Sequence, residues 1–184
     1  MVNYNMKKYL VFILIFSFQN VDSQQGVNYL KLMNDFVLVD SMELNKCFKN
    51  GKLKESGILK IYKYGDYFYK FKSGKYVKNY KDGSKSIFLL DDWGTDLEAY
   101  HFDSGGNLIK EWVTTKVETT AVDLEEFLNS NKHITYDTAF KDYRYDYKLC
   151  KYYLKKKGQY SNGKKVGAWK FFDSSGNLKK EKKY

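Results

Sequence analysis

Proline is absent from this chain of 184 residues, arginine occurs once, as Arg144, and cysteine and histidine occur twice each. The missing proline excludes a polyproline linker, and two cysteines are too few for a disulfide-dense small domain. A single arginine leaves little for the bidentate base contacts and planar stacking of a nucleic-acid site, so nucleic acid is a disfavoured partner. The 43% hydrophobic and 18% aromatic residues, by contrast, suffice for one domain with an ordinary core.

Lysine supplies nearly all of the positive charge behind the formal net charge of +10. Residues 148–184 contain twelve lysines against Asp173 and Glu181, so the last fifth of the chain carries the whole net charge. Lysine is also favoured by AT-rich codons, as are the abundant tyrosine, asparagine and phenylalanine. Two interpretations therefore stand: compositional drift, or a basic segment that binds anionic lipid, polysaccharide or nucleic acid.

Residues 1–23 have the three parts of a secretory signal peptide. Two lysines precede the apolar run of residues 9–18, and a polar stretch ends at Ser23. The apolar run is about half of the roughly 20 residues that span a bilayer, so we expect export and cleavage near Ser23 rather than a membrane anchor. Residues 24–184 would then be a periplasmic or extracellular protein.

The two cysteines are Cys47 and Cys150. In an oxidising compartment they could close one disulfide, and the alternative is two buried thiols that behave as small apolar groups. No C-x-x-C pair and no Cys/His cluster is present, so neither redox catalysis nor a structural zinc is indicated.

Glycine contexts predict β-hairpins. Residues 71–74 (FKSG), 80–83 (YKDG) and 160–163 (YSNG) each place a small polar residue and glycine after an aromatic, which is typical of a tight turn between strands. The runs between the turns are rich in aromatic and β-branched residues. The predicted strands are residues 58–64, 67–72, 75–80, 86–90, 97–102, 108–117, 147–154 and 168–172.

One segment repeats. Residues 102–111 (FDSGGNLIKE) match residues 172–181 (FDSSGNLKKE) at eight of ten positions. This repeat predicts two hairpins with a Ser-Gly-Asn tip, each followed by a strand that begins at Leu108 or Leu178.

Between the two copies, residues 123–129 place apolar side chains at helical spacing behind acidic residues, which predicts one short helix. Residues 134–147 are too rich in tyrosine and aspartate for an assignment, and we interpret them as an extension packed beside the sheet. The expected organisation is therefore a single β-rich domain. Its parts are an N-terminal segment (24–57), degenerate hairpin repeats (58–117), a helix-containing insert (118–157) and a C-terminal repeat (158–184).

The C-terminal segment 160–181 (YSNGKKVGAWKFFDSSGNLKKE) resembles a bacterial MORN-like repeat of the antitoxin-like type. That pattern runs aromatic, x, Asn-Gly, Lys, x, x, Gly, x, Trp, then an aromatic, a glycine turn, Leu and Glu. The resemblance implies an elongated antiparallel sheet of stacked hairpins, and it implies structural roles for Gly163, Gly167, Trp169 and Gly176. It brings no catalytic, cofactor or metal residues.

Earlier segments resemble the repeat less closely. Around residues 93–108, Trp93-Gly94 stands where Asn-Gly is expected, the second glycine is missing, and Tyr100 takes the place of the tryptophan. Residues 71–75 and 80–84 are interpreted as further decayed units.

Candidate chemistry is sparse. His101 and His133 share no metal-ligand spacing and are expected to be structural. The acidic run of residues 91–98, which includes Asp91, Asp92 and Asp96, lacks the spacing of an EF-hand loop, and a polar hairpin turn explains it more simply than calcium binding. We therefore expect no enzyme, no catalytic residues, no metal and no cofactor.

The leading functional hypothesis is an exported, non-enzymatic repeat protein that binds a protein or an envelope polymer through its aromatic sheet surface. Two alternatives stay open: an envelope immunity or antitoxin-like protein, and electrostatic attachment of the lysine-rich end to an anionic polymer or lipid. The partner's identity and the oligomeric state are not predicted.

Overall fold

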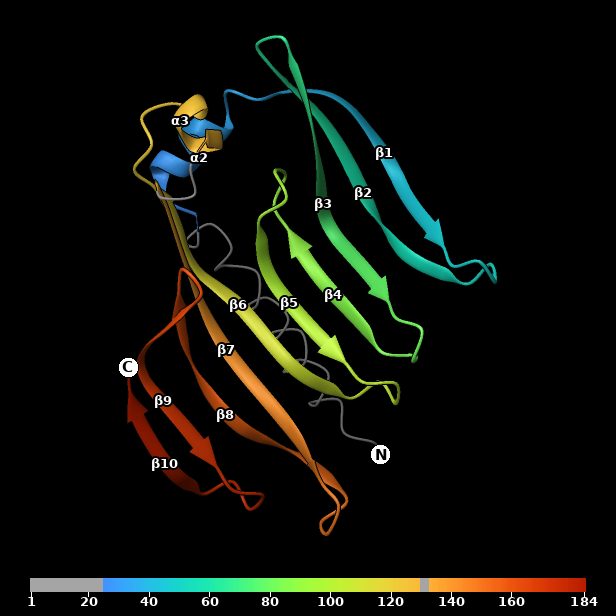
Figure 1. Ribbon diagram of the computed structural model, residues 1–184, viewed down its shortest axis with the longest axis vertical. Helices are drawn as coiled ribbons and strands as arrows, with labels where there is room; N and C mark the ends of the chain where they lie inside the picture. Colours follow the sequence, from blue (N-terminus) through green and yellow to red (C-terminus); the bar gives the residue numbers. More distant parts are fainter. Residues whose placement is uncertain (1–24, 130–132) are drawn as a thin grey trace, which may run out of the picture.

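A computed structural model describes residues 25–129 and 133–184, and in it ten strands form one antiparallel sheet whose spatial order is the order of the chain (Figure 1). The mainly β prediction is confirmed. Antiparallel neighbours need only short turns, so a chain rich in turn signals builds a meander. The strands are β1 (Val37–Cys47), β2 (Leu53–Tyr64), β3 (Tyr67–Asn79), β4 (Lys85–Leu90), β5 (Asp96–Phe102), β6 (Leu108–Thr119), β7 (Ile134–Asp146), β8 (Lys151–Ser161), β9 (Lys164–Phe172) and β10 (Leu178–Lys183).

Five turns in the described residues are built on one backbone pattern. In each, the first N–H donates to the fifth carbonyl and the N–H of the fourth residue, a glycine, donates back to the first carbonyl. The glycines have φ between +79° and +89°, which a side chain with a Cβ adopts only at a cost. The pattern is a type I turn followed by a left-handed residue, a common hairpin connection. The five turns span residues 48–52, 80–84, 91–95, 103–107 and 173–177.

The repeated block forms two of these turns, as predicted. Asp103 and Asp173 each accept the main-chain N–H of the residue four positions later, Asn107 or Asn177, at 2.9 Å. The strands that follow begin at Leu108 and Leu178. The matching sequence therefore marks matching local structure, because an aspartate oxygen satisfies a turn N–H.

The turn predicted at residues 71–74 is wrong. These residues lie inside β3, and the strands predicted at 67–72 and 75–80 are one strand. Gly74 has φ +64° because it occupies a β-bulge, where residues 56–58 of β2 oppose residues 73–77 of β3. The strand predicted from residue 147 is also corrected: β8 begins at Lys151, after a turn in which Cys150 has positive φ.

Residues 134–147 contain the strand β7, which lies between β6 and β8 within the sheet rather than beside it. The short helix predicted at 123–129 is confirmed as α3 (Leu124–Asn129). A second helix, α2 (Val27–Met33), was not predicted. It begins directly after Gly26, whose N–H donates to the Val117 carbonyl of β6 at 2.6 Å.

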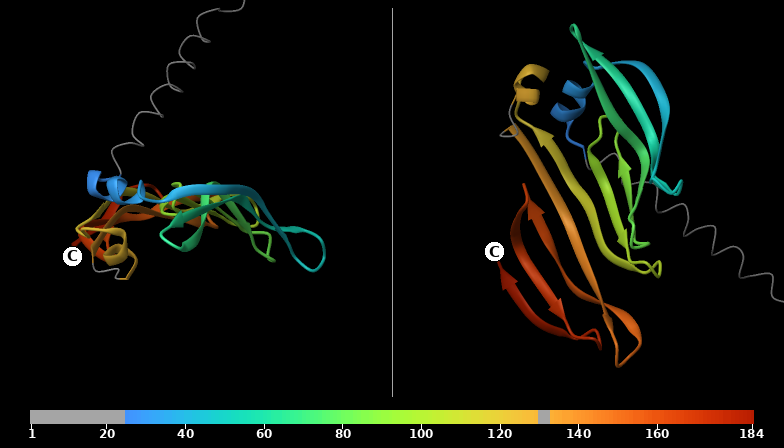
Figure 2. Two further views of the ribbon diagram at one scale, coloured as in Figure 1. Left: turned by 90° about the horizontal axis from the view of Figure 1, so that it is seen from above. Right: turned by 45° about the vertical axis from the view of Figure 1, so that its right-hand side comes forward.

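The main core lies where two strands of the sheet are short. β4 and β5 have six and seven residues, whereas β3 and β6 have thirteen and twelve, and the two helices lie near the upper ends of the longer strands (Figures 1 and 2). Helices and strands bury an apolar cluster there, which ties the N-terminal and central strands together. Its members are Tyr29, Leu32, Met33, Phe36, Tyr62, Val117, Ala121 and Leu124.

Over the described residues, neither helix is long and apolar enough to cross a membrane. The signal-peptide prediction falls on residues 1–23, which lie outside the described part of the chain.

Candidate functional site

A continuous ladder of aromatic rings crosses the sheet from β3 to β9. Successive ring centroids lie 5.0 to 6.1 Å apart, mostly in edge-to-face or tilted contacts, which aromatic pairs prefer. We call this set the aromatic ladder: Tyr76, Phe88, His101, Trp112, Phe140 and Trp169, with Tyr160 packed against the last two.

Strand register places these rings on one face. Phe88 of β4 pairs with Ala99 of β5, Ala99 pairs with Trp112 of β6, and Trp112 pairs with Phe140 of β7. Directly paired residues point to the same face, so each strand contributes side chains at alternate positions.

At the C-terminal end, Trp169 completes the ladder and is fully buried. A Cβ added to Gly158 of β8 would lie 2.3 Å from its ring, so the glycine makes room for the indole. The indole Nε1 donates to the Gln159 carbonyl at 3.2 Å, and Tyr184 covers the outer side.

The β2–β3 hairpin repeats this arrangement. Residues 157–159 of β8 oppose residues 166–170 of β9, the same two-against-four bulge that β2 and β3 form. Gly167, like Gly74, has φ +64°, and each precedes a buried aromatic by two residues, Trp169 or Tyr76. Residues 71–75 thus supply the inner glycine of a repeat unit and not its turn.

In the β5–β6 hairpin the position equivalent to Trp169 carries no aromatic ring. Counting back four residues from the first turn residue leads to Trp169 in the C-terminal hairpin and to Ala99 here. The interpretation that Tyr100 takes the tryptophan's place is therefore wrong. Tyr100 points to the opposite face, where its hydroxyl donates to Glu98 at 2.5 Å.

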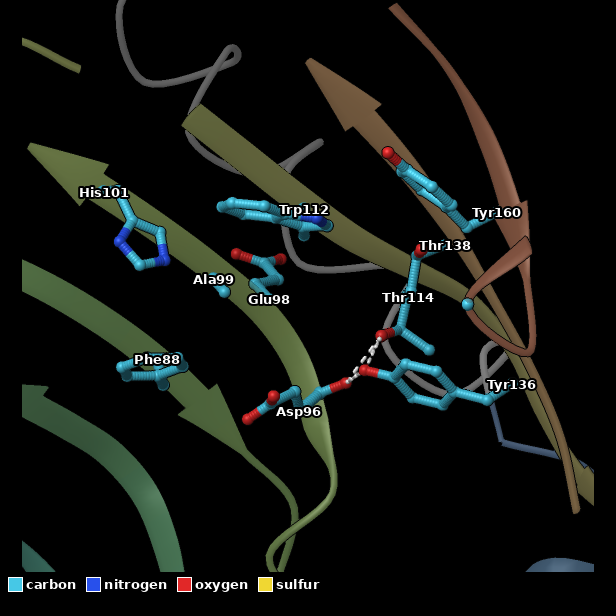
Figure 3. A pocket seen from close by; sticks show the side chains of 11 residues that line it. Phe88, Asp96, Glu98, Ala99, His101, Trp112, Thr114, Tyr136, Thr138 and Tyr160 are labelled. Atoms are coloured by element: carbon cyan, nitrogen blue, oxygen red, sulfur yellow. Dashed lines mark hydrogen bonds between the residues drawn. The ribbon is translucent and has the colours of Figure 1, made fainter. Parts of the chain in front are cut away.

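The small side chain of Ala99 leaves a groove of about 370 Å³ in the ladder (Figure 3). Its floor consists of small side chains, Ala99, Thr114 and Thr138. Aromatic and imidazole rings form the walls, and Asp96 lies at one end beside Tyr136. The wall residues are Phe88, His101, Trp112, Tyr136 and Tyr160, and Glu98 and Gly163 complete the lining.

Hydrogen bonds fix the end of the groove near Asp96. The hydroxyls of Thr114 and Tyr136 both donate to the Asp96 carbonyl, at 2.5 and 2.7 Å. Thr114 is almost fully buried, so this contact holds β5, β6 and β7 in one arrangement. The wall is formed before any ligand arrives, which lowers the entropic cost of binding.

Two ionisable groups in the groove have shifted pKa values. Burial and the neighbouring Asp91 carboxylate raise the pKa of Asp96, although this side chain keeps contact with solvent. Burial, assisted by Lys110, lowers the pKa of His101, so its imidazole is neutral at pH 7. His101 Nδ1 and the Ser86 hydroxyl share a hydrogen bond of 2.7 Å.

The acidic run does not gather its carboxylates around one point. Asp91 is buried and accepts hydrogen bonds from the Tyr29 hydroxyl and the main chain of its own turn. Asp92 instead pairs with Lys60 of β2 at 2.5 Å. Within residues 25–129 and 133–184, no three acidic, histidine or cysteine side chains cluster as metal ligands would.

The remaining candidate residues lie elsewhere. His133 contacts Glu126 at 3.2 Å, outside the groove. Cys47 lies at the end of edge strand β1 and Cys150 in the β7–β8 turn, and both are free and exposed. Both expectations from the sequence, a disulfide and two buried thiols, are therefore wrong. The groove itself was missed, because it depends on which residue faces Trp112, and that is a matter of register.

No family model and no curated protein matches this chain. A solved structure from Bacteroides fragilis, of a protein with unknown function, aligns over 79% of this chain and 92% of its own at 13% identity, with a TM-score of 0.22. A likeness at that level carries no argument about this protein.

Proposed function

We propose that this protein is an exported, non-enzymatic module that binds a protein or an envelope polymer in the groove at Ala99. One observation carries the proposal: Ala99 occupies the position that Trp169 holds in the C-terminal hairpin, and aromatic rings of the ladder border the groove that this small side chain leaves. Concave apolar sites with a few polar groups are the usual form of a binding site. The repeated bulge of β2–β3 and β8–β9 supports the MORN-like interpretation.

The hydrogen-bonded pair of Ser86 and the groove residue His101 favours binding rather than catalysis. Ser86 and His101 are hydrogen-bonded, which is the geometry of a nucleophile and its base. Ser86, however, is fully buried and cannot reach a substrate. A role for this pair in fixing the imidazole ring fits its surroundings better.

The test is a substitution that fills the groove with a large side chain. In Ala99→Trp, an indole enters the position that Trp169 holds in the C-terminal hairpin. Tyr100→Trp is the matched control, because it places the same side chain on the opposite face of β5. Purified wild-type and variant proteins are used to capture material from an envelope extract. We expect the wild type and Tyr100→Trp to retain the same component and Ala99→Trp to lose it.

Equal capture by all three proteins, or none by any, would contradict the proposal. Identification of the retained component as a toxin would favour the immunity alternative. Cell fractionation tests export separately, and recovery of an uncleaved cytoplasmic chain would contradict it.

The basic end supports a second candidate, electrostatic attachment to an anionic polymer or lipid. All six residues of β10 are exposed, and four of them are lysines. Lys165 lies 4.6 Å from the Trp169 ring centre and Lys182 lies 4.5 Å from that of Tyr184, so charge and aromatic surface alternate. The test replaces the four β10 lysines with glutamine and keeps Tyr184, whose ring packs against Trp169. Binding to anionic vesicles that is unchanged by this replacement and by salt would exclude the candidate.

A further inference from the structure

The groove at Ala99 differs in charge from the rest of the protein. The chain has a net charge of +10, yet none of the described residues that line the groove is a lysine or an arginine. The lining contains two acidic residues, Asp96 and Glu98. The Glu98 carboxylate accepts the hydroxyl of Tyr100 on the other face, which leaves Asp96 as the charge at the groove.

The Asp96 carboxylate has no basic partner among the residues that the structure describes. The hydrogen bonds from Thr114 and Tyr136 reach its main-chain oxygen, and within residues 25–129 and 133–184 the carboxylate accepts no hydrogen bond. The adjacent Asp91 contacts Gln25, Tyr29, Thr95 and main-chain N–H groups, all of them neutral. Lys70 and Lys72 line a neighbouring hollow that Asp96 also borders, but neither forms an ion pair with Asp96 in the described part of the chain, and Lys72 lies over the Tyr76 ring near Glu55. Asp96 therefore faces the groove without an ion-pair partner.

The walls add a second attraction for positive charge. The faces of aromatic rings are electron-rich, and a cation within about 6 Å of a ring centre is stabilised, most strongly by tryptophan. Phe88, Trp112, Tyr136 and Tyr160 border the groove, and His101 between them is uncharged and does not repel a cation. Apolar rings also favour methyl or methylene groups around that charge.

We propose that the groove binds a small organic cation, an alkylammonium group that packs its methyl or methylene surface against the rings and directs its charge toward Asp96. The volume of about 370 Å³ lies at the small end of ligand sites and fits such a group. This inference rests on the proposed binding function and names the chemical group that the module recognises.

The test compares choline with 3,3-dimethyl-1-butanol, a neutral molecule of the same shape. Each is titrated into the isotopically labelled full chain, and the indole N–H resonance of Trp112 is followed, with those of Trp93 and Trp169 as internal references. We expect a saturable shift of the Trp112 resonance, with choline binding at least tenfold more tightly than the alcohol. A primary amine, n-butylammonium, extends the comparison to a less substituted cation.

Two variants test whether the Asp96 carboxylate is the group that attracts the cation. Asp96→Asn keeps the size of the side chain and the main-chain hydrogen bonds, and we expect it to weaken choline binding about tenfold without changing the affinity for the alcohol. Asp92→Asn is the matched control, because Asp92 lies in the same loop region but pairs with Lys60 outside the groove. We expect this control to bind choline as the wild type does.

Equal affinities for choline and the alcohol would overturn the cation proposal and leave the groove as an apolar binding site. A Trp112 resonance that a neutral disaccharide shifts and choline does not would overturn it in favour of a glycan. The absence of any shift with choline and n-butylammonium would also overturn it, whereas the proposed function is decided separately by capture with Ala99→Trp.

Discussion

The β5–β6 hairpin and the β9–β10 hairpin have the same type of turn and differ at the position four residues before it. Four residues before the turn, one has Ala99 and the other has Trp169, which is fully buried against Gly158. Where the large ring is present, the sheet surface is filled and the position stabilises the fold. Where alanine replaces it, neighbouring rings border an open groove. The same scaffold thus provides structure at one site and a binding surface at another.

The largest effect is expected at the filled site. Trp169→Ala removes a fully buried indole and its contacts with Phe140 and Tyr160. We expect a loss of about 3 to 5 kcal/mol in the free energy of unfolding, measured by urea titration. A loss below about 1 kcal/mol would show that the two hairpins do not differ as described.

Gly158→Ala is expected to be next in size. The added methyl group would overlap the Trp169 ring, and overpacking of this kind costs about 1 to 3 kcal/mol. In the Trp169→Ala background the same substitution should cost almost nothing, because the obstructing ring is gone. Additive effects of the two substitutions in a double-mutant cycle would contradict the contact.

Ala99→Trp is expected to have a small effect on stability, within about 1.5 kcal/mol of the wild type, because the ring enters space that is already open. Tyr100→Trp on the other face gives the reference for an added indole. If urea titration shows that Ala99→Trp unfolds the protein, the groove is not available for a ring of this size.

The smallest effect concerns pH. Burial lowers the pKa of His101 in the folded state, so the unfolded chain, with a pKa near 6.5, takes up protons first. Stability contributed by the neutral ring is complete above pH 6.5 and is lost as the pH falls through this value toward the folded pKa. In His101→Gln the urea midpoint should change less between pH 7 and pH 5 than it does in the wild type. An identical pH profile in both proteins would contradict this.

Local signals gave the turns and several strands. Asp-Gly and Asn-Gly after an aromatic residue, at residues 80–83 and 160–163, predicted the turns that join β3 to β4 and β8 to β9, because these residues determine backbone conformation over a few positions. The repeated block predicted a shared turn for the same reason. The helical spacing of apolar residues over a short segment was also sufficient to predict α3.

Features that depend on partners distant in the chain were missed. Gly74 has the sequence context of a turn glycine, yet its positive φ serves a bulge that only the pairing with β2 reveals. β7 is rich in tyrosine and aspartate and becomes a strand because β6 and β8 pair with it on both sides. The groove requires knowing that Ala99 lies between Phe88 and Trp112, and a slip of one residue would place Tyr100 there instead.

The groove at Ala99 is the proposed binding surface. The most direct measurement is the amount of envelope component that Ala99→Trp retains relative to Tyr100→Trp, with both variants matched to the wild type in urea midpoint. We expect Ala99→Trp to lose the component and Tyr100→Trp to retain it fully. Equal retention by the two variants would contradict it.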